Sequence, residues 1–192
     1  MSEIAYSLIP RDLEQLYSLL ARLQPGESYL LSGARRLVWQ LGQELADKVA
    51  IQGPLRLILG GNRYSVDRLP ILLGDQAHRI YEVLNRIQLT RAETAYQMLH
   101  ALETTPAEST PIFVTDFLDS FYEEALDLTE VTRLVRRCLG QMQRLNARAP
   151  LFISAALTTE RPTLLAMLQT LCDYQLQLYP EDQPHIRQGQ LL

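Results

Sequence analysis

Ser28-Tyr29-Leu30-Leu31-Ser32-Gly33 is a short apolar run that ends on glycine, and a helical pattern over residues 36–49 follows it directly. A buried strand that leads into a helix is the first half of a β–α–β unit, in which the helix returns the chain for a parallel strand. The same alternation continues to the end of the chain. Further strands are expected at residues 55–59, 85–89, 112–116, 151–154 and 174–178.

Helical periodicity fills the intervals between these strands. Thr90 and Glu93 form a T-x-x-E capping box before an apolar stripe, and Asp127 with Glu130 opens the most regular helix of the chain. The other helices are expected over residues 75–84 and 162–171, and within residues 1–24.

This alternation predicts an α/β fold, a three-layer sandwich with a mainly parallel central sheet and helices on both faces. The turn at residues 180–184 is expected to return a last strand over 185–192, so that the chain ends in an antiparallel hairpin. With 192 residues and 47 % hydrophobic content, the chain is expected to be a single domain. Residues 1–24 would form an N-terminal helix and residues 26–192 the core.

Composition argues against several classes of protein. Cys138 and Cys172 share no metal-ligand spacing, and the three histidines lie far apart, so we expect neither a disulfide scaffold nor a metal site. The chain has no apolar run of about 20 residues and no signal-peptide pattern, which favours a cytoplasmic protein without membrane partners. A net charge of -4 gives no global attraction to nucleic acid.

Four stretches of the chain carry a resemblance to a known family. Residues 26–33 read as a strand that runs into a phosphate loop, 57–69 as a strand and turn, 85–99 as a short strand and helix, and 111–116 as an apolar strand that ends in aspartate. In this order they resemble the ATPase core of the RecA and RadA recombinase family, which includes the KaiC-like proteins. The resemblance covers roughly residues 15–192 and implies a RecA-like sheet. The positions that would form its nucleotide crevice are Gly33, Arg35, Arg36, Gly60, Gly61 and Asp116.

The residues that would bind and split ATP are missing. The motif G-x-x-x-x-G-K-[ST] needs glycines whose N–H groups wrap the phosphates, a lysine and a hydroxyl for Mg²⁺. After Gly33 the chain instead enters a helix, the bulky Trp39 is expected to occupy the vacated space, and the single lysine, Lys48, lies elsewhere. The resemblance implies a water-directing glutamate at Gly61, where glycine has no such group. We therefore expect no ATPase activity and no cofactor, with Asp116 left as a fold relic or a hydrogen-bond acceptor.

The resemblance places DNA-binding loops after the strands that contain Asp116 and Ser154. The first region, residues 121–127, is acidic and the second, 158–162, is short, so filament-style DNA binding is not expected there. A basic strip remains on the helix that begins near Asp127, with spacings of four and seven residues. Its members are Arg133, Arg137, Arg144 and Arg148. Such a strip is either solvated helix surface or a contact for an acidic partner or nucleic acid.

The sequence thus predicts a pseudo-ATPase that serves as an accessory or interaction subunit in DNA recombination or repair. Its partner would be a RecA-like ATPase or a second copy of itself, to which it would supply an interface or an arginine. The candidates for that role are Arg68, Arg86 and Arg91. Two alternatives stay open: a small-molecule or signalling module that reuses the former crevice, and direct DNA binding through the basic strip. Arg35 and Arg36 would either hold an anion or face a partner.

Overall fold

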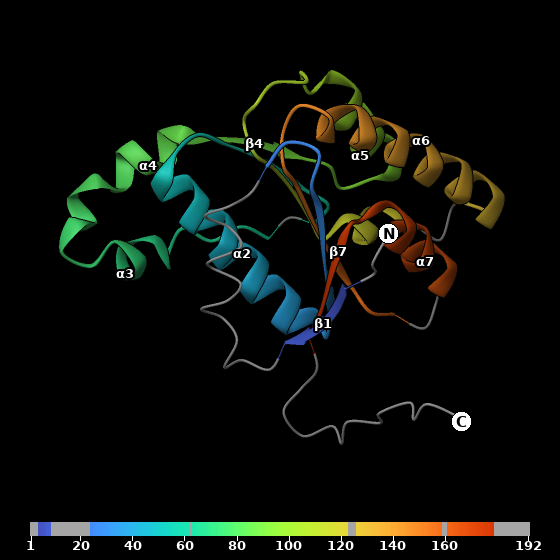
Figure 1. Cartoon of the computed structure of the whole chain (residues 1–192), viewed down its shortest axis with the longest axis horizontal. Coiled ribbons are helices and arrows are strands. Elements are labelled where there is room, and N and C mark those ends of the chain that lie inside the picture. Colours follow the sequence, from blue (N-terminus) through green and yellow to red (C-terminus); the bar gives the residue numbers. More distant parts are fainter. Residues whose placement is uncertain (1–3, 9–23, 62, 123–125, 159–160, 179–192) are drawn as a thin grey trace.

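The computed structural model of the chain describes residues 4–8, 24–61, 63–122, 126–158 and 161–178 (Figure 1). Most of the helix predicted within residues 1–24 lies outside these residues, and so does the last strand predicted over 185–192. The strands and α-helices are, in chain order, β1 (Ile4–Leu8), β2 (Ser28–Gly33), α2 (Arg35–Gln52), β3 (Leu55–Leu59), α3 (Leu69–Leu73), α4 (Ile80–Arg86), β4 (Ile87–Arg91), α5 (Ala95–Thr104), β5 (Ile112–Thr115), α6 (Leu128–Asn146), β6 (Leu151–Ala156), α7 (Pro162–Leu171) and β7 (Tyr174–Leu178).

The described strands form one seven-stranded sheet in the order β1-β7-β2-β6-β5-β3-β4. Every pairing between neighbours is parallel. The chain leaves β2 for β3 and β4 at one edge, and then returns through β5 and β6 to β7. The connections from β2 to β4 run toward one edge of the sheet, and those from β4 to β7 run back in the opposite direction. Open α/β sheets bind ligands at the carboxyl ends of the strands where this direction changes, which are here the ends of β2, β6, β5 and β3.

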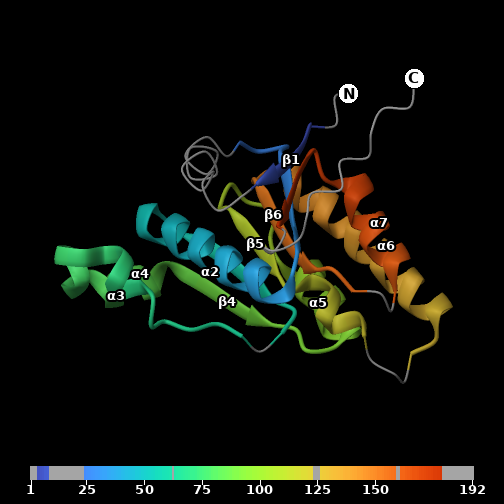
Figure 2. The same cartoon turned by 90° about the horizontal axis from the view of Figure 1, so that it is seen from below.

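Helices cover both faces of the sheet, which makes the predicted three-layer sandwich. Figure 2 shows α2, α3 and α4 on one side of the strands and α5, α6 and α7 on the other. Right-handed crossovers require this division, since the two groups of helices accompany strand connections that run in opposite directions. Side chains alternate accordingly: Leu57 and Leu59 of β3 pack with the α2 side, whereas Ile58 packs with the α6 side.

One predicted capping box is wrong. Thr90 belongs to β4, because that strand pairs with β3 along its whole length and places Arg91 opposite Leu59. The box lies four residues later: Thr94 Oγ1 accepts from the Gln97 backbone N–H, and Gln97 Oε1 accepts from the Thr94 N–H, each at 3.2 Å. Helix α5 therefore begins at Ala95.

Three further features differ from the sequence expectations. The helix predicted over 75–84 is a 3₁₀ helix at Gly74–Arg79 followed by α4, and the short α3 precedes both. Strand β1 has no counterpart among the expected strands. Strand β7 occupies its predicted residues, but both of its edges are already paired, one with β2 and one with β1. The C-terminal antiparallel hairpin is therefore not confirmed.

Candidate functional site

The junction between β2 and α2 leaves no loop at the carboxyl end of β2. Ala34 is the single residue between the strand and the helix, and its backbone N–H donates to the Leu178 carbonyl of β7 at 3.3 Å. Gly33 has a φ of +144°, and a Cβ there would lie 2.2 Å from the same carbonyl oxygen. Gly33 is thus required by the close approach of β7, and the backbone here is engaged with a neighbouring strand rather than curled around an empty space.

The two glycines after β3 lie against the end of β5, but they differ in the room around them. A Cβ on Gly60 would lie 2.2 Å from the Asp116 carbonyl oxygen, so a side chain is excluded. A Cβ on Gly61 would meet nothing closer than 3.7 Å, and its nearest neighbours are the side chains of Asp116 and Asp119. A larger residue at 61 would therefore fit, with both carboxyl groups beside it.

Asp116 is a buried acid at the tip of β5. It adopts a left-handed backbone conformation (φ 51°), and its N–H donates to Ser154 Oγ of β6 at 3.0 Å. No described residue donates a hydrogen bond to its carboxylate. Burial, together with the nearby negative charge of Asp119, raises the pKa of Asp116 to about 6, although Arg63 and Arg35 act in the opposite direction.

An ion pair ties the beginning of α2 to the segment after β5. Arg35 Nη1 donates to Asp119 Oδ2, and Asp119 belongs to the 3₁₀ helix Phe117–Phe121. Ser120 of the same segment is buried, and its hydroxyl lies within hydrogen-bonding distance of the carbonyl oxygens of Gly60 and Ala92 (2.9 and 2.6 Å). These contacts fix the carboxyl ends of the strands relative to one another.

Residues 63–68, which we call the strap, run along α2 and cover the crevice. Helix α2 meets the strap with side chains four residues apart, which lie on one face of a helix. Trp39 Nε1 donates to the Arg63 carbonyl at 3.2 Å, and the Ser65 N–H donates to Gln43 Oε1 at 3.3 Å. The Gln43 amide also donates back to the Ser65 carbonyl. The strap is therefore bonded to the helix through both backbone and side chains.

The strap makes a second set of contacts with α2, and these involve the fully buried acid Asp47. Tyr64 Oη donates to Asp47 Oδ1 at 2.9 Å, whereas Asp47 Oδ2 is buried and has no hydrogen-bond partner among the described residues. Burial raises the pKa of Asp47 to about 6, even though the Tyr64 hydrogen bond lowers it. Arg68 donates to Glu44 Oε2 at 2.9 Å and to the Gln40 carbonyl at 3.1 Å.

Trp39 and Arg63 divide the crevice into two spaces, since both residues line each of them. The inner cavity measures about 10 Å³, and Thr115, Asp116 and Ser154 contribute to its wall. That volume holds about one water molecule. Thr115 Oγ1 is buried there, and no residue of the described part of the chain forms a hydrogen bond with it. The outer hollow measures about 340 Å³. It is lined by Arg35, Arg36, Trp39 and Arg63.

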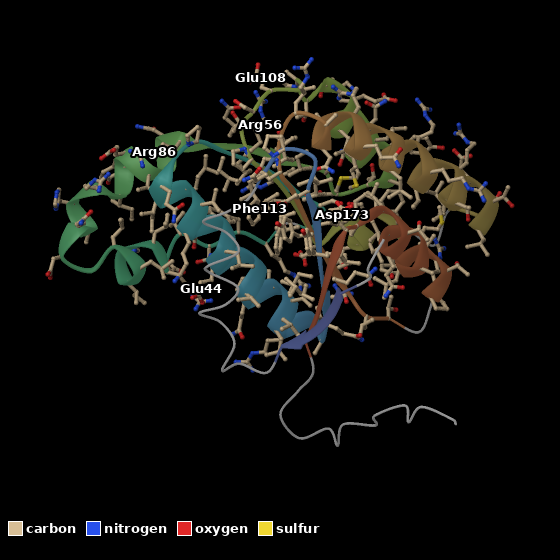
Figure 3. All side chains as sticks on the ribbon, in the orientation of Figure 1. Glu44, Arg56, Arg86, Glu108, Phe113 and Asp173 are labelled. Atoms are coloured by element: carbon tan, nitrogen blue, oxygen red, sulfur yellow. The ribbon has the colours of Figure 1, made fainter. Side chains whose placement is uncertain are left out.

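The three arginines predicted as interface residues have different surroundings. Arg68 lies in the strap and donates directly to Gln40 and Glu44 of α2. Arg86, which is labelled in Figure 3, donates to the Ile51 carbonyl at the end of α2 at 2.8 Å and pairs with Glu82. Arg91 is exposed at the carboxyl end of β4, and no described residue pairs with it. The sequence gives all three the same role, but the structure holds two of them in contacts within the chain.

The basic strip of α6 is also partly engaged. Arg133 pairs with Glu130, and Arg137 pairs with Glu103 of α5 at 2.7 Å. Arg144 donates to the carbonyls of Leu102 and Thr105 at the end of α5, each at 2.9 Å. Arg148 is exposed, and among the described residues it has no such partner. The strip therefore joins α6 to α5 as well as facing solvent.

Of the positions predicted from the sequence, the structure brings Arg35, Arg36, Gly60, Gly61 and Asp116 to one crevice. Arg68 is the predicted position that lies in the strap, and the buried acid Asp47 has no counterpart among the predicted positions. The one signal for this acid in the sequence is polar spacing: Gln43 and Asp47 lie four residues apart on a helix with apolar residues around them.

Within the described part of the chain, no three His, Cys, Asp or Glu side chains gather where they could hold a metal ion. No helix among these residues is long and apolar enough to cross a membrane. Comparison of the chain with protein-family models gives no match. Comparison with curated proteins gives none either.

Proposed function

We propose that this chain is a RecA-like pseudo-ATPase, a subunit that does not hydrolyse ATP and that acts by binding another protein in DNA recombination or repair. One observation carries the proposal: β2 passes into α2 through Ala34 alone, so the place of a phosphate loop is taken by a contact with Leu178. The absence of the lysine and glutamate that such a site needs agrees with this geometry.

The size of the crevice supports the same conclusion. Pockets for ligands of ordinary size measure about 300–1,000 Å³. The inner cavity beside Asp116 measures about 10 Å³, and Trp39 and the strap separate it from the surface. A triphosphate would have to displace both before it reached Asp116. At that point it would meet a buried carboxylate and no ammonium group, which is an unfavourable environment for an anion.

A non-catalytic subunit acts through its surfaces, and the proposed partner is a RecA-like ATPase or a second copy of this chain. Arg91 is the interface candidate that this geometry favours, because it is exposed and has no described partner. Arg68 and Arg86 would first have to break their contacts with Glu44 and Glu82. An arginine held by a neighbouring acid is a weaker donor in trans than one that is unpaired.

Two measurements test the proposal. Calorimetric titration with ATP and Mg²⁺, run beside a turnover assay, should show neither micromolar binding nor hydrolysis. Co-expression with the RecA-like ATPases of the same organism should yield a stable complex, and Arg91→Glu should weaken it while Arg79→Glu, on the 3₁₀ helix Gly74–Arg79, does not. Hydrolysis of ATP by the purified chain would refute the pseudo-ATPase proposal, and failure to form any complex would refute the partner role.

A small-molecule or signalling module is the second candidate function, and the outer hollow of about 340 Å³ favours it. That volume lies at the lower end of the range for ligand pockets. Thermal-shift screening of the whole chain against small anionic metabolites would distinguish the two functions. A ligand that stabilises the wild type but not a Trp39→Ala variant would support this alternative.

A further inference from the structure

The outer hollow combines two guanidinium groups that have no ion-pair partner among the described residues with an indole ring. Most arginines of the described chain are held by an acid or a carbonyl oxygen, as Arg68, Arg86 and Arg144 are. Arg36 and Arg63 are exposed, and none of the described residues pairs with them, although they line the same hollow as Trp39. Two unpaired cations are thus directed to one place on the surface.

The indole of Trp39 is held in position for a partner. Its Nε1 donates to the Arg63 carbonyl, so the ring is anchored to the strap instead of rotating freely. A fixed tryptophan side chain loses little conformational entropy on binding, and tryptophan and arginine are among the residue types most enriched in the energetic centres of protein interfaces. The hollow therefore has the composition of an interface centre.

Local electrostatics favour an anionic occupant. Arg36 lies in the first turn of α2, where the helix dipole is positive and where no acidic side chain compensates it. Arg35, the neighbouring cation, is already paired with Asp119. An incoming carboxylate would relieve the repulsion between Arg36, Arg63 and the helix end.

The extent of the positive charge decides between a protein and a nucleic acid. A nucleic-acid strand requires a track of cations along successive phosphates. Here the charge is confined to one hollow, Asp116 and Asp119 lie at the adjoining crevice, and the net charge of the chain is -4. A single carboxylate beside a flat or apolar side chain fits this arrangement better than a polyanion.

We propose that the hollow lined by Arg36, Trp39 and Arg63 is a docking site for an acidic segment of a partner protein, in which an Asp or Glu pairs with the two guanidinium groups and an adjacent apolar side chain packs on the indole. The inference rests on the proposed function, because it identifies a further surface, besides the one that carries Arg91, through which the interaction subunit binds a partner.

Selection from a displayed library of random peptides tests this chemistry even while the partner is unidentified. The whole chain is the bait, and the enriched peptides are synthesised and titrated while the emission of Trp39, the single tryptophan, is followed. The enriched sequences should carry an acid next to an aromatic or large aliphatic residue and should shift the Trp39 emission. Enrichment of sequences without acids would overturn the proposal.

Charge reversal gives the matched control. Arg36→Glu and Arg63→Glu should each weaken binding at least about tenfold, as expected for the loss of a central charge pair. Arg79→Glu, a charge reversal on the 3₁₀ helix Gly74–Arg79 outside the hollow, should leave it unchanged. Glutamate in the first turn of α2 suits the helix dipole, so the Arg36 variant is expected to fold, and its circular dichroism spectrum checks this. Binding that survives both reversals would contradict the assignment.

A parallel titration with single-stranded oligothymidylate and with AMP separates the other occupants. The wild type and Arg36→Glu are compared in each titration. If the variant abolishes the change in Trp39 emission caused by the nucleotides but not the change caused by the peptides, the hollow binds nucleic acid and the acidic segment is refuted. The docking site and the proposed function can also be refuted separately. A stable complex with an ATPase that persists in Arg36→Glu leaves the partner role intact and refutes only this surface.

Discussion

Replacement of Asp47 by asparagine should remove a defined part of the pH dependence of stability. Asp47 is fully buried, and burial raises its pKa from 3.8 to about 6. Because the folded state binds the proton more tightly than the unfolded state, this group stabilises the fold below about pH 4, and the contribution is lost as the pH rises through about 6. The full difference is about 3 kcal/mol, at about 1.4 kcal/mol for each pKa unit.

The wild type and Asp47→Asn are compared at a pH high enough that acid does not unfold them. Between about pH 5 and pH 7.5 the wild type should lose about 1–2 kcal/mol of unfolding free energy relative to Asp47→Asn, which is the part of the titration that falls in this window. Urea denaturation followed by Trp39 fluorescence measures both proteins at each pH. Other titrating groups cancel in the difference, and Asp75→Asn, an exposed replacement, serves as the control. A difference between wild type and variant that does not change with pH would refute the assignment of a raised pKa to this carboxyl.

Three further predictions concern the crevice. Trp39→Ala should join the inner cavity to the outer hollow and lower the unfolding free energy by about 1–3 kcal/mol in chemical denaturation, less than for a fully buried tryptophan, and calorimetry should still detect no ATP binding. Gly60→Ala should cost about 1–3 kcal/mol or more because its Cβ would lie 2.2 Å from the Asp116 carbonyl oxygen, whereas Gly61→Ala should fall within about 0.5 kcal/mol of the wild type; equal thermal denaturation of the two would contradict the packing described here. Tyr64→Phe should cost about 1–3 kcal/mol, since a buried carboxylate of α2 loses its donor, and a circular dichroism melt that matches the wild type would argue against the strap.

The alternation of strands and helices could be predicted from the sequence because it depends on local patterns. The apolar residues of 55–59 and the alternating pattern of 174–178 predict β3 and β7 with the bounds that the structure has. The spacing of the leucines and valines after Asp127 predicts α6. Local pattern fails where two matches overlap. Thr90–Glu93 and Thr94–Gln97 both fit a capping box, and only the pairing of β4 with β3, which lies far away in sequence, decides between them.

The glycines and the aspartate at the strand ends could be located from the sequence, but the contacts that fill the crevice could not. Glycines and an aspartate after strands indicate where a crevice lies, since parallel strands end at the same edge. Closure of that crevice depends on contacts between residues distant along the chain, such as Tyr64 with Asp47 and Trp39 with Arg63. The sequence shows these side chains only as polar or aromatic positions of a helix and a loop. For the same reason it could not show that Arg68 is already paired.

The single-residue link between β2 and α2 has an evolutionary consequence. Ala34 is the whole connection, so it leaves no chain that could form a phosphate loop. To build such a loop would require an insertion and, at the same moment, the release of the Leu178 carbonyl that Gly33 and Ala34 now contact. Intermediate sequences would lose the attachment of β7 to β2 inside the sheet before they gained a nucleotide site. Point substitutions alone therefore do not turn this junction into a nucleotide site.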